Sequence, residues 1–110
     1  DVRCRVCCGT ESILTKVAED TNAPVFNEAG VLTITAKAQS VLIEVIDLST
    51  DSDKGGYVIG YARRRLDDII AVGEEGGWLE ILDNDNDKVP GPGGPAAVSV
   101  KFEVVSKRLA

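Results

Sequence analysis

Short runs of β-branched and aromatic residues alternate with turn-forming clusters along the chain. The clearest run closes the chain, where Val98, Val100 and Phe102 are each followed by a polar residue, as in a half-buried strand. The run at 41–47 is apolar almost throughout, which indicates a strand covered on both faces. The pattern predicts strands at 2–8, 13–19, 31–35, 41–47, 57–62, 78–82 and 96–105.

A helical spacing of apolar residues occurs in the stretch 63–72. Leu66, Ile69 and Ile70 would share one face there, but the piece is barely two turns long. Many short strands accompanied by one helical turn are typical of a sandwich or a barrel. The pattern therefore predicts an all-β fold.

Length and composition agree with one globular domain. The chain has 110 residues, 44% of them hydrophobic and 27% charged, which excludes a disordered acidic tail. Its longest apolar runs are far shorter than the roughly 20 residues of a membrane-spanning helix. We therefore expect a single soluble domain over residues 1–110 that does not span a membrane.

Charge and missing residue types narrow the function. The net charge of −6 repels phosphate backbones, so nucleic acid is not an expected partner. The chain has no histidine, which removes the commonest general base and most zinc sites. Paired carboxylates such as Glu74 and Glu75 lie between glycines without a companion nucleophile. We therefore expect no enzymatic activity.

The three cysteines lie close together near the start of the chain. On a strand, Cys4 and Cys8 would share one face about 13 Å apart, too far for a disulfide, while Cys7 would face the other way. Cys4, Cys7 and Cys8 resemble half of a zinc site, but no second pair of ligands follows, so we expect Cys4 and Cys8 to be small core residues. Free thiols favour a reducing compartment, either the cytosol or the interior of an organelle such as a plastid or mitochondrion.

Several segments follow one another in the order of a known family. They are PVFNE at 24–28, VLIEVID at 41–47, YVIGYARRRL at 57–66, WLEIL at 78–82 and VSVKFEV at 98–104. The most specific is TNAPVFNE at 21–28, which differs from the usual Thr-Leu-Asn-Pro-Val-Phe-Asn-Glu at two positions. Through these segments the chain resembles the C2 domain, whose members bind calcium and phospholipid or dock proteins.

The resemblance implies an antiparallel Greek-key β-sandwich of about seven to eight strands. It places Trp78 in the core. The usual first strand of the family and the first half of its first calcium loop have no counterpart in the sequence. A sheet without this strand would have open backbone edges, so we expect a partner or another segment to donate one. The exposed edge of the strand at 2–8 is the expected place.

The resemblance also implies a calcium site that is only partly kept. Asp1 matches a ligand position in the first loop, and Asp47 matches one in the loop after 41–47. Ser49 and Tyr57 stand where the family has two further aspartates, although Asp51 and Asp53 lie nearby. Because calcium prefers six to eight oxygen ligands, Asp1, Asp47, Asp51 and Asp53 would form at best an altered site. The alternative is a solvated acidic turn.

Two other features of the sequence bear on ligands. Neither DLSTDSD at 47–53 nor DNDND at 83–87 has the glycine of an EF-hand loop, so weak calcium binding is the most that either would give. The strands that match the lysine-rich, lipid-binding face of some C2 domains hold Lys16 and Lys37. Arg63–Arg65 form the densest basic group, which we interpret as a solvated strand end near acidic Asp67 and Asp68.

These observations lead to two hypotheses. The first is a non-catalytic C2-like interaction module, or a small structural subunit of a larger assembly beside a membrane. It would have a degraded calcium site, a protein partner and no required cofactor. The alternative is a calcium-dependent phospholipid-binding C2 domain that uses the four aspartates in altered geometry. Whether calcium changes stability or lipid affinity separates the two.

Overall fold

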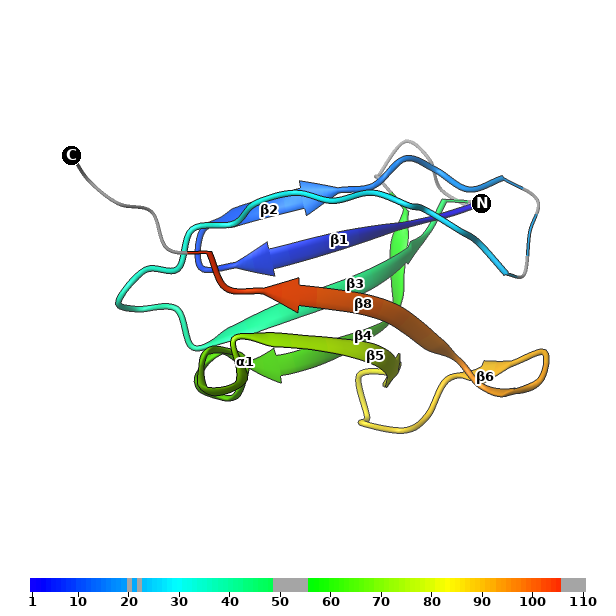
Figure 1. Cartoon of the computed structure of the whole chain (residues 1–110). Coiled ribbons are helices and arrows are strands. Elements are labelled where there is room, and N and C mark those ends of the chain that lie inside the picture. The colour runs from blue at the N-terminus through cyan, green and yellow to red at the C-terminus, as the bar shows by residue number, and fades with distance from the viewer. Residues whose placement is uncertain (20, 22, 49–55, 106–110) are drawn as a thin grey trace.

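The structure is a computed structural model that describes residues 1–19, 21, 23–48 and 56–105. Within these residues it is built of antiparallel strands and one short helix (Figure 1). The elements are β1 (Val2–Cys8), β2 (Glu11–Leu14), β3 (Ser40–Asp47), β4 (Tyr57–Arg65), α1 (Leu66–Val72), β5 (Glu74–Glu80), β6 (Pro90–Gly91), β7 (Gly94–Pro95) and β8 (Ala97–Glu103). The predicted all-β antiparallel fold is confirmed.

One layer is a four-stranded sheet in the order β2-β1-β3-β4. β1 pairs with β2 on one side and with β3 on the other, so it is an inner strand. The prediction of an exposed edge on 2–8 is therefore wrong. One edge of β1 is paired with its hairpin partner at 11–14, and the other edge is paired with the distant strand at 40–47.

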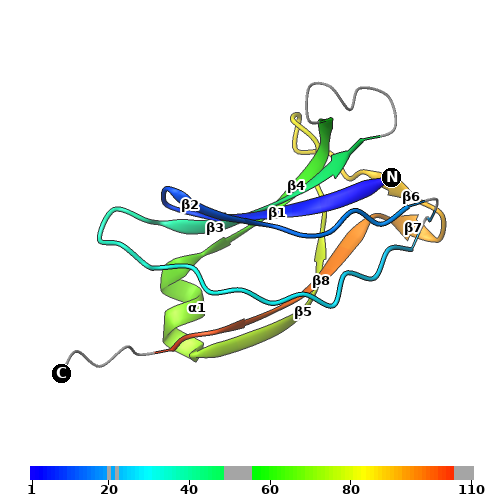
Figure 2. The same ribbon diagram turned by 90° about the horizontal axis from the view of Figure 1, so that it is seen from above.

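The other layer contains the two-stranded sheet of β5 and β8 (Figure 2). The two layers are joined beside β4, where Tyr61 and Leu82 exchange backbone hydrogen bonds of 2.9 Å in both directions. Gly60 permits this close approach, since a Cβ at that position would collide with Ile81. The two layers thus meet at this point beside β4, through an isolated bridge.

The helix α1 caps one end of the sandwich. It buries Leu66 and Ile69. Asp67 and Asp68 lie in its first turn, where negative side chains interact favourably with the positive end of the helix dipole. It ends at Gly73, whose φ of 82° permits the left-handed cap and whose amide donates to the Ile69 carbonyl. The helical prediction for 63–72 holds for the apolar part, whereas the three arginines extend β4.

The core lies between the layers and is centred on β3. Ile43 is 2% exposed, and Cys4 and Cys8 are 4% and 2% exposed. Cys8 packs in a cluster with Val41, Leu66 and Ile69, and Leu32 and Phe102 pack around this cluster. The alternation along residues 2–8 predicted this burial of Cys4 and Cys8, which is confirmed.

Three sequence-based expectations differ from the structure. Residues 31–35 form no strand, because their backbone shares no ladder with any described strand. The strand expected at 13–19 stops at Leu14, after which Thr15 donates to Cys4 and an isolated bridge joins Ala18 to Val2. Trp78 is 75% exposed rather than buried, because it lies on the outer face of β5.

Candidate functional site

The pairing of β5 with β8 fixes the direction of every backbone group of β8. Directly opposite residues bond at both ends of the ladder: Val104 donates to Gly73, and Ile81 donates to Ala96. Hydrogen-bonded and non-hydrogen-bonded pairs alternate in an antiparallel ladder. The even-numbered residues of β8 therefore direct their backbone groups toward β5, and the odd-numbered residues direct theirs away from it.

The odd-numbered residues form an open backbone edge, which we call the β8 edge. Its members are Ala97, Ser99, Lys101 and Glu103. Their amides and carbonyls make no backbone hydrogen bond to any part of the chain that the structure describes. A row of unpaired groups of this kind is a template for the addition of another strand.

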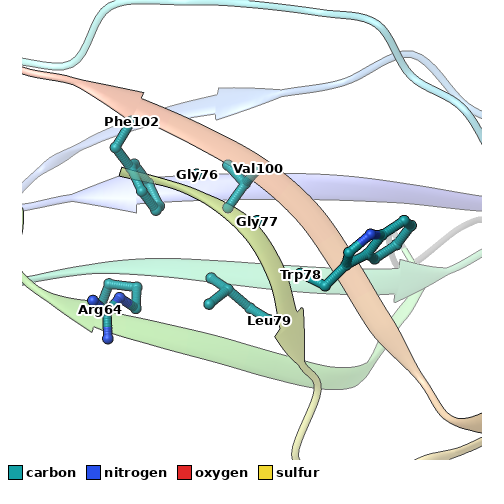
Figure 3. Close-up of a pocket in the computed structure, with 7 residues that line it drawn as sticks. All are labelled: Arg64, Gly76, Gly77, Trp78, Leu79, Val100 and Phe102. Atoms are coloured by element: carbon teal, nitrogen blue, oxygen red, sulfur yellow. The ribbon is translucent and has the colours of Figure 1, made fainter. Parts of the chain in front are cut away.

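The side chains of β8 divide between the two faces of its sheet. Figure 3 shows Val100 and Phe102 on the same side as Leu79 of β5 and Arg64 of β4, around a hollow of about 160 Å³. The odd-numbered side chains are exposed on the opposite face. The β8 edge thus combines an apolar inner face with a solvated outer face, as a half-buried sheet requires.

The outer face of this sheet carries a small charge network. The Lys101 ammonium lies 3.0 Å from a carboxylate oxygen of Glu74 and 3.0 Å from one of Glu103. The hydrogen bond to Glu74, and then the one to Glu103, raise the pKa of Lys101. Because all three side chains are exposed, this network holds the outer face of the sheet in place only weakly.

The segment of residues 23–36 runs along the same layer as β8 (Figures 1 and 2). Two carboxylates connect it to the β2 region: Glu11 accepts the Thr33 amide at 2.5 Å, and Glu28 accepts the Lys16 amide at 2.6 Å. Among the described residues, nothing forms a backbone–backbone hydrogen bond with 23–34. Side chains and Leu32 packing, rather than a ladder, therefore hold this segment.

The structure brings together two of the four predicted calcium ligands. Asp47 pairs with Val2 across β1 and β3, and the Leu48 amide donates to the Asp1 carbonyl at 2.9 Å, so Asp1 and Asp47 end neighbouring strands. The Tyr57 hydroxyl donates to Asp47 at 3.3 Å. Asp51 and Asp53 lie outside the described residues.

A different group of acids is found in the loop after β5. Carboxylate oxygens of Asp83, Asp85 and Asp87 lie within 4.8 Å of one another, in the DNDND segment that lacks an EF-hand pattern. Asp83 accepts the amides of Asp85 and Asp87 at 2.9 and 3.0 Å, which forms a tight turn. These hydrogen bonds hold the turn that brings the three residues together.

The basic residues of β4 do not form one surface. Arg63 and Arg65 are exposed, and Arg65 lies 3.6 Å from Asp67, which agrees with a solvated strand end. Arg63 stacks on Tyr61, with 5.7 Å between the guanidinium and the ring centre. Arg64 turns inward toward Phe102 (Figure 3).

The thiols are held in their protonated form. Burial raises the pKa of Cys4 to about 11 and also raises the pKa of Cys8. Burial, and then the charge of Glu44, raise the pKa of Cys7. Glu44 is engaged by Arg5 at 2.7 Å. Because the thiolate is the nucleophile, none of these groups is activated for covalent chemistry.

Comparison with protein families assigns the architecture. The model of the C2 domain family matches residues 1–81, from β1 through β5. This chain belongs to the C2 domain family. C2 domains are in general non-catalytic modules that bind membranes, calcium or proteins. Searches of curated proteins and of solved structures gave no significant match for this C2 domain.

The β8 edge was missed by the sequence analysis, which placed the open edge on 2–8. The alternation at 96–105 predicted that this segment is a half-buried strand. It did not predict which strands lie on either side of it. A second sign was the strand pattern of 31–35, which forms no ladder in the structure.

The described residues include no helix long and apolar enough to cross a bilayer.

Proposed function

We propose that this C2 domain is a non-catalytic docking module that pairs an extended segment of a partner protein with the β8 edge. The observation that carries the proposal is the one-sided pairing of β8. Four residues offer an amide and a carbonyl each, so a docked strand would gain a row of main-chain hydrogen bonds. Pairing of this kind needs neither calcium nor a catalytic group.

The state of the other edges supports the same site. β1 and β3 are paired on both sides, and Tyr61 of β4 exchanges backbone hydrogen bonds with Leu82. Among the described strands, β5 has one neighbour, as β8 does. The edge of β2 faces residues 23–36, which hydrogen-bond to Glu11. The β8 edge belongs to a seven-residue strand, and native proteins usually protect a long exposed edge.

Backbone hydrogen exchange with a synthetic probe tests the proposal. The probe is a blocked nonapeptide in which valine alternates with threonine and lysine, added at up to about 1 mM to detect weak modular binding. It should slow exchange of the amides of Ala97, Ser99, Lys101 and Glu103, with no requirement for calcium. A peptide of the same composition with its valines contiguous is the control.

A proline variant makes the test specific to the edge. Ser99→Pro removes one donor of the β8 edge, whereas Ser99→Ala keeps it. Binding of the nonapeptide should be lost in the first variant and kept in the second. Equal binding by both variants, or exchange that the peptide leaves unchanged, would exclude docking at this edge.

A second candidate function is calcium-dependent phospholipid binding. It is favoured by the position of Asp1 and Asp47 at adjacent strand ends. Calcium at about 1 mM should then raise the melting temperature and cause sedimentation with phosphatidylserine vesicles, and Asp47→Asn should abolish both effects. Identical melting curves in calcium and in chelator would exclude this function.

A further inference from the structure

The outer face of the four-stranded sheet is basic, although the chain as a whole has a net charge of −6. Its residues follow from the alternation of side chains beside buried Cys4 and Ile43. They include Arg3, Arg5 and Cys7 of β1, Leu42 and Glu44 of β3, and Tyr61, Arg63 and Arg65 of β4. Figure 2 shows the other layer and the segment 23–36 on the opposite side of this sheet. Cations thus gather on the face that is turned away from the core.

A hollow of about 320 Å³ opens on this face, where β1 and β4 end and β3 begins. Cys7 and Leu42 lie opposite each other in the β1–β3 ladder, and both line the hollow as half-buried side chains. Arg63 pairs with Leu42 from the other side, and Lys37 lines the hollow from the loop before β3. We call this place the Lys37–Arg63 hollow. It combines an apolar lining with two exposed cations.

Backbone hydrogen bonds hold the loop that carries Lys37. The Ala38 amide donates to the Thr35 carbonyl at 3.1 Å, and the Leu66 amide at the start of α1 donates to the Gln39 carbonyl at 2.9 Å. Ala38 also packs against the buried cluster of the core. The chain on both sides of Lys37 is therefore held before a ligand arrives, which lowers the entropic cost of binding.

The two cations of the hollow have no carboxylate partner among the residues that the structure describes. Arg63 instead lies over the ring of Tyr61, at 5.7 Å, where it keeps its charge and its edge donors. Neighbouring cations of this face are already paired: Arg5 with Glu44 at 2.7 Å, and Arg65 with Asp67 at 3.6 Å. Lys37 and Arg63 are therefore the charges available to a ligand.

We infer that the Lys37–Arg63 hollow binds an acidic segment of a partner protein. One apolar side chain of the segment enters the hollow against Cys7 and Leu42, and carboxylates on either side of it pair with Lys37 and Arg63. The volume is near the lower limit of pockets that enclose a whole small molecule, about 300–1,000 Å³, so a single side chain fits it better. This site lies on the opposite layer from the β8 edge and does not depend on docking there.

Charge and depth favour a peptide over a membrane surface. Basic clusters that bind anionic lipid bilayers usually contain about four to eight lysines or arginines, each contributing about 1 kcal/mol. The hollow offers two such charges. Its apolar lining would meet only polar headgroups at a bilayer surface, whereas a peptide presents an apolar side chain and carboxylates together.

Fluorescence anisotropy with a synthetic probe tests the inference. The probe is a blocked, labelled pentapeptide with one leucine between two pairs of glutamates, and the same peptide with glutamines is the control. Lys37→Gln and Arg63→Gln should each weaken binding of the probe by about threefold to fivefold, as expected for one exposed ion pair. Lys101→Gln makes the same change on the outer face of the opposite layer and should leave binding unchanged.

Protection of a thiol locates the bound peptide. Cys7 lines the hollow, whereas Cys4 and Cys8 are buried in the core. The acidic probe should therefore slow alkylation of Cys7 by N-ethylmaleimide, measured by mass spectrometry. The glutamine peptide should leave the rate as it is.

Each result decides for or against the acidic segment. Weaker binding in both hollow variants together with protection of Cys7 supports it. Equal binding of the glutamine peptide, an equal loss in Lys101→Gln, or an unchanged alkylation rate overturns it. Sedimentation with phosphatidylserine vesicles that Arg63→Gln abolishes, without binding of the peptide, would make the hollow a membrane contact instead. Loss of the peptide in Ser99→Pro would place it on the β8 edge and would also overturn the inference.

Discussion

Proline at two neighbouring positions of β8 should affect stability very differently. The ladder directs the Val98 amide toward Leu79 of β5, whereas the Ser99 amide belongs to the open edge. Proline has no amide hydrogen, and a strand accepts it only where that hydrogen would face away from the sheet. Val98→Pro should therefore break the ladder, and Ser99→Pro should leave it intact.

The expected magnitudes follow from the groups involved. Val98→Pro removes one backbone hydrogen bond worth about 1 kcal/mol and leaves the carbonyl of half-buried Leu79 without its donor, at a further cost of about 1–3 kcal/mol. The sum of about 2–4 kcal/mol corresponds to a decrease of roughly 8–16 °C in melting temperature for a domain of this size. Ser99→Pro breaks no bond, so the change should stay below about 1 kcal/mol.

Urea unfolding followed by far-ultraviolet circular dichroism measures both effects. Val98→Ala is the control for the lost side chain, because it keeps the amide, and Ser99→Ala serves the same purpose at the neighbouring position. The free energy of unfolding of each proline variant is compared with that of its alanine control. The difference isolates the backbone contribution at each position.

The comparison can refute the assignment of the β8 edge. If Ser99→Pro destabilises the domain as much as Val98→Pro, the odd-numbered amides are bonded within the fold and no open edge exists. If Ser99→Pro is the more damaging of the two, the alternation is reversed. In either case the docking proposal loses its basis.

Three further predictions concern the core and the thiols. Ile43→Ala should lower the free energy of unfolding by about 2–5 kcal/mol and Ile43→Val by about 0.5–1.5 kcal/mol in urea titrations, because Ile43 is 2% exposed; equal losses would contradict its central position. Trp78→Ala should cost less than about 1 kcal/mol in the same assay, since a buried tryptophan would cost about 3–5 kcal/mol. The folded protein holds the Cys4 proton more tightly than the unfolded chain, with a pKa of about 11 against 9.0. The melting temperature should therefore fall as the pH rises from 9.0 toward 11, and less steeply in Cys4→Ala.

The buried residues were predictable wherever apolar side chains recur with the period of a strand or a helix. Alternation along residues 2–8 assigned Cys4 and Cys8 to the core, and the continuous apolar run at 41–47 indicated the inner strand β3. These assignments depend on which face of a strand is apolar. Because successive side chains point to opposite faces, a few neighbouring residues are enough to show this. The spacing of Leu66 and Ile69 likewise predicted the buried face of the helix from neighbouring residues alone.

The candidate site was not predictable from these patterns. A strand pattern does not say whether a neighbour is present on each edge, so 31–35 was predicted as a strand and 2–8 as an edge. Trp78 was assigned to the core by resemblance, whereas the register of β5 with β8 places it opposite Ser99 on the solvated face. Each of these errors concerns pairing between distant segments.

The sequence by itself determined the family, the all-β class and the residues that face the core, because side-chain alternation and segment order are written along the chain. The tertiary structure alone decided which edges are paired, that Asp1 and Asp47 end neighbouring strands, and that β8 pairs with β5 alone among the described strands. The physical reason is that backbone hydrogen bonds have the same chemistry at every residue. Only the spatial neighbours of a strand determine which of those bonds are made and which remain available to a partner.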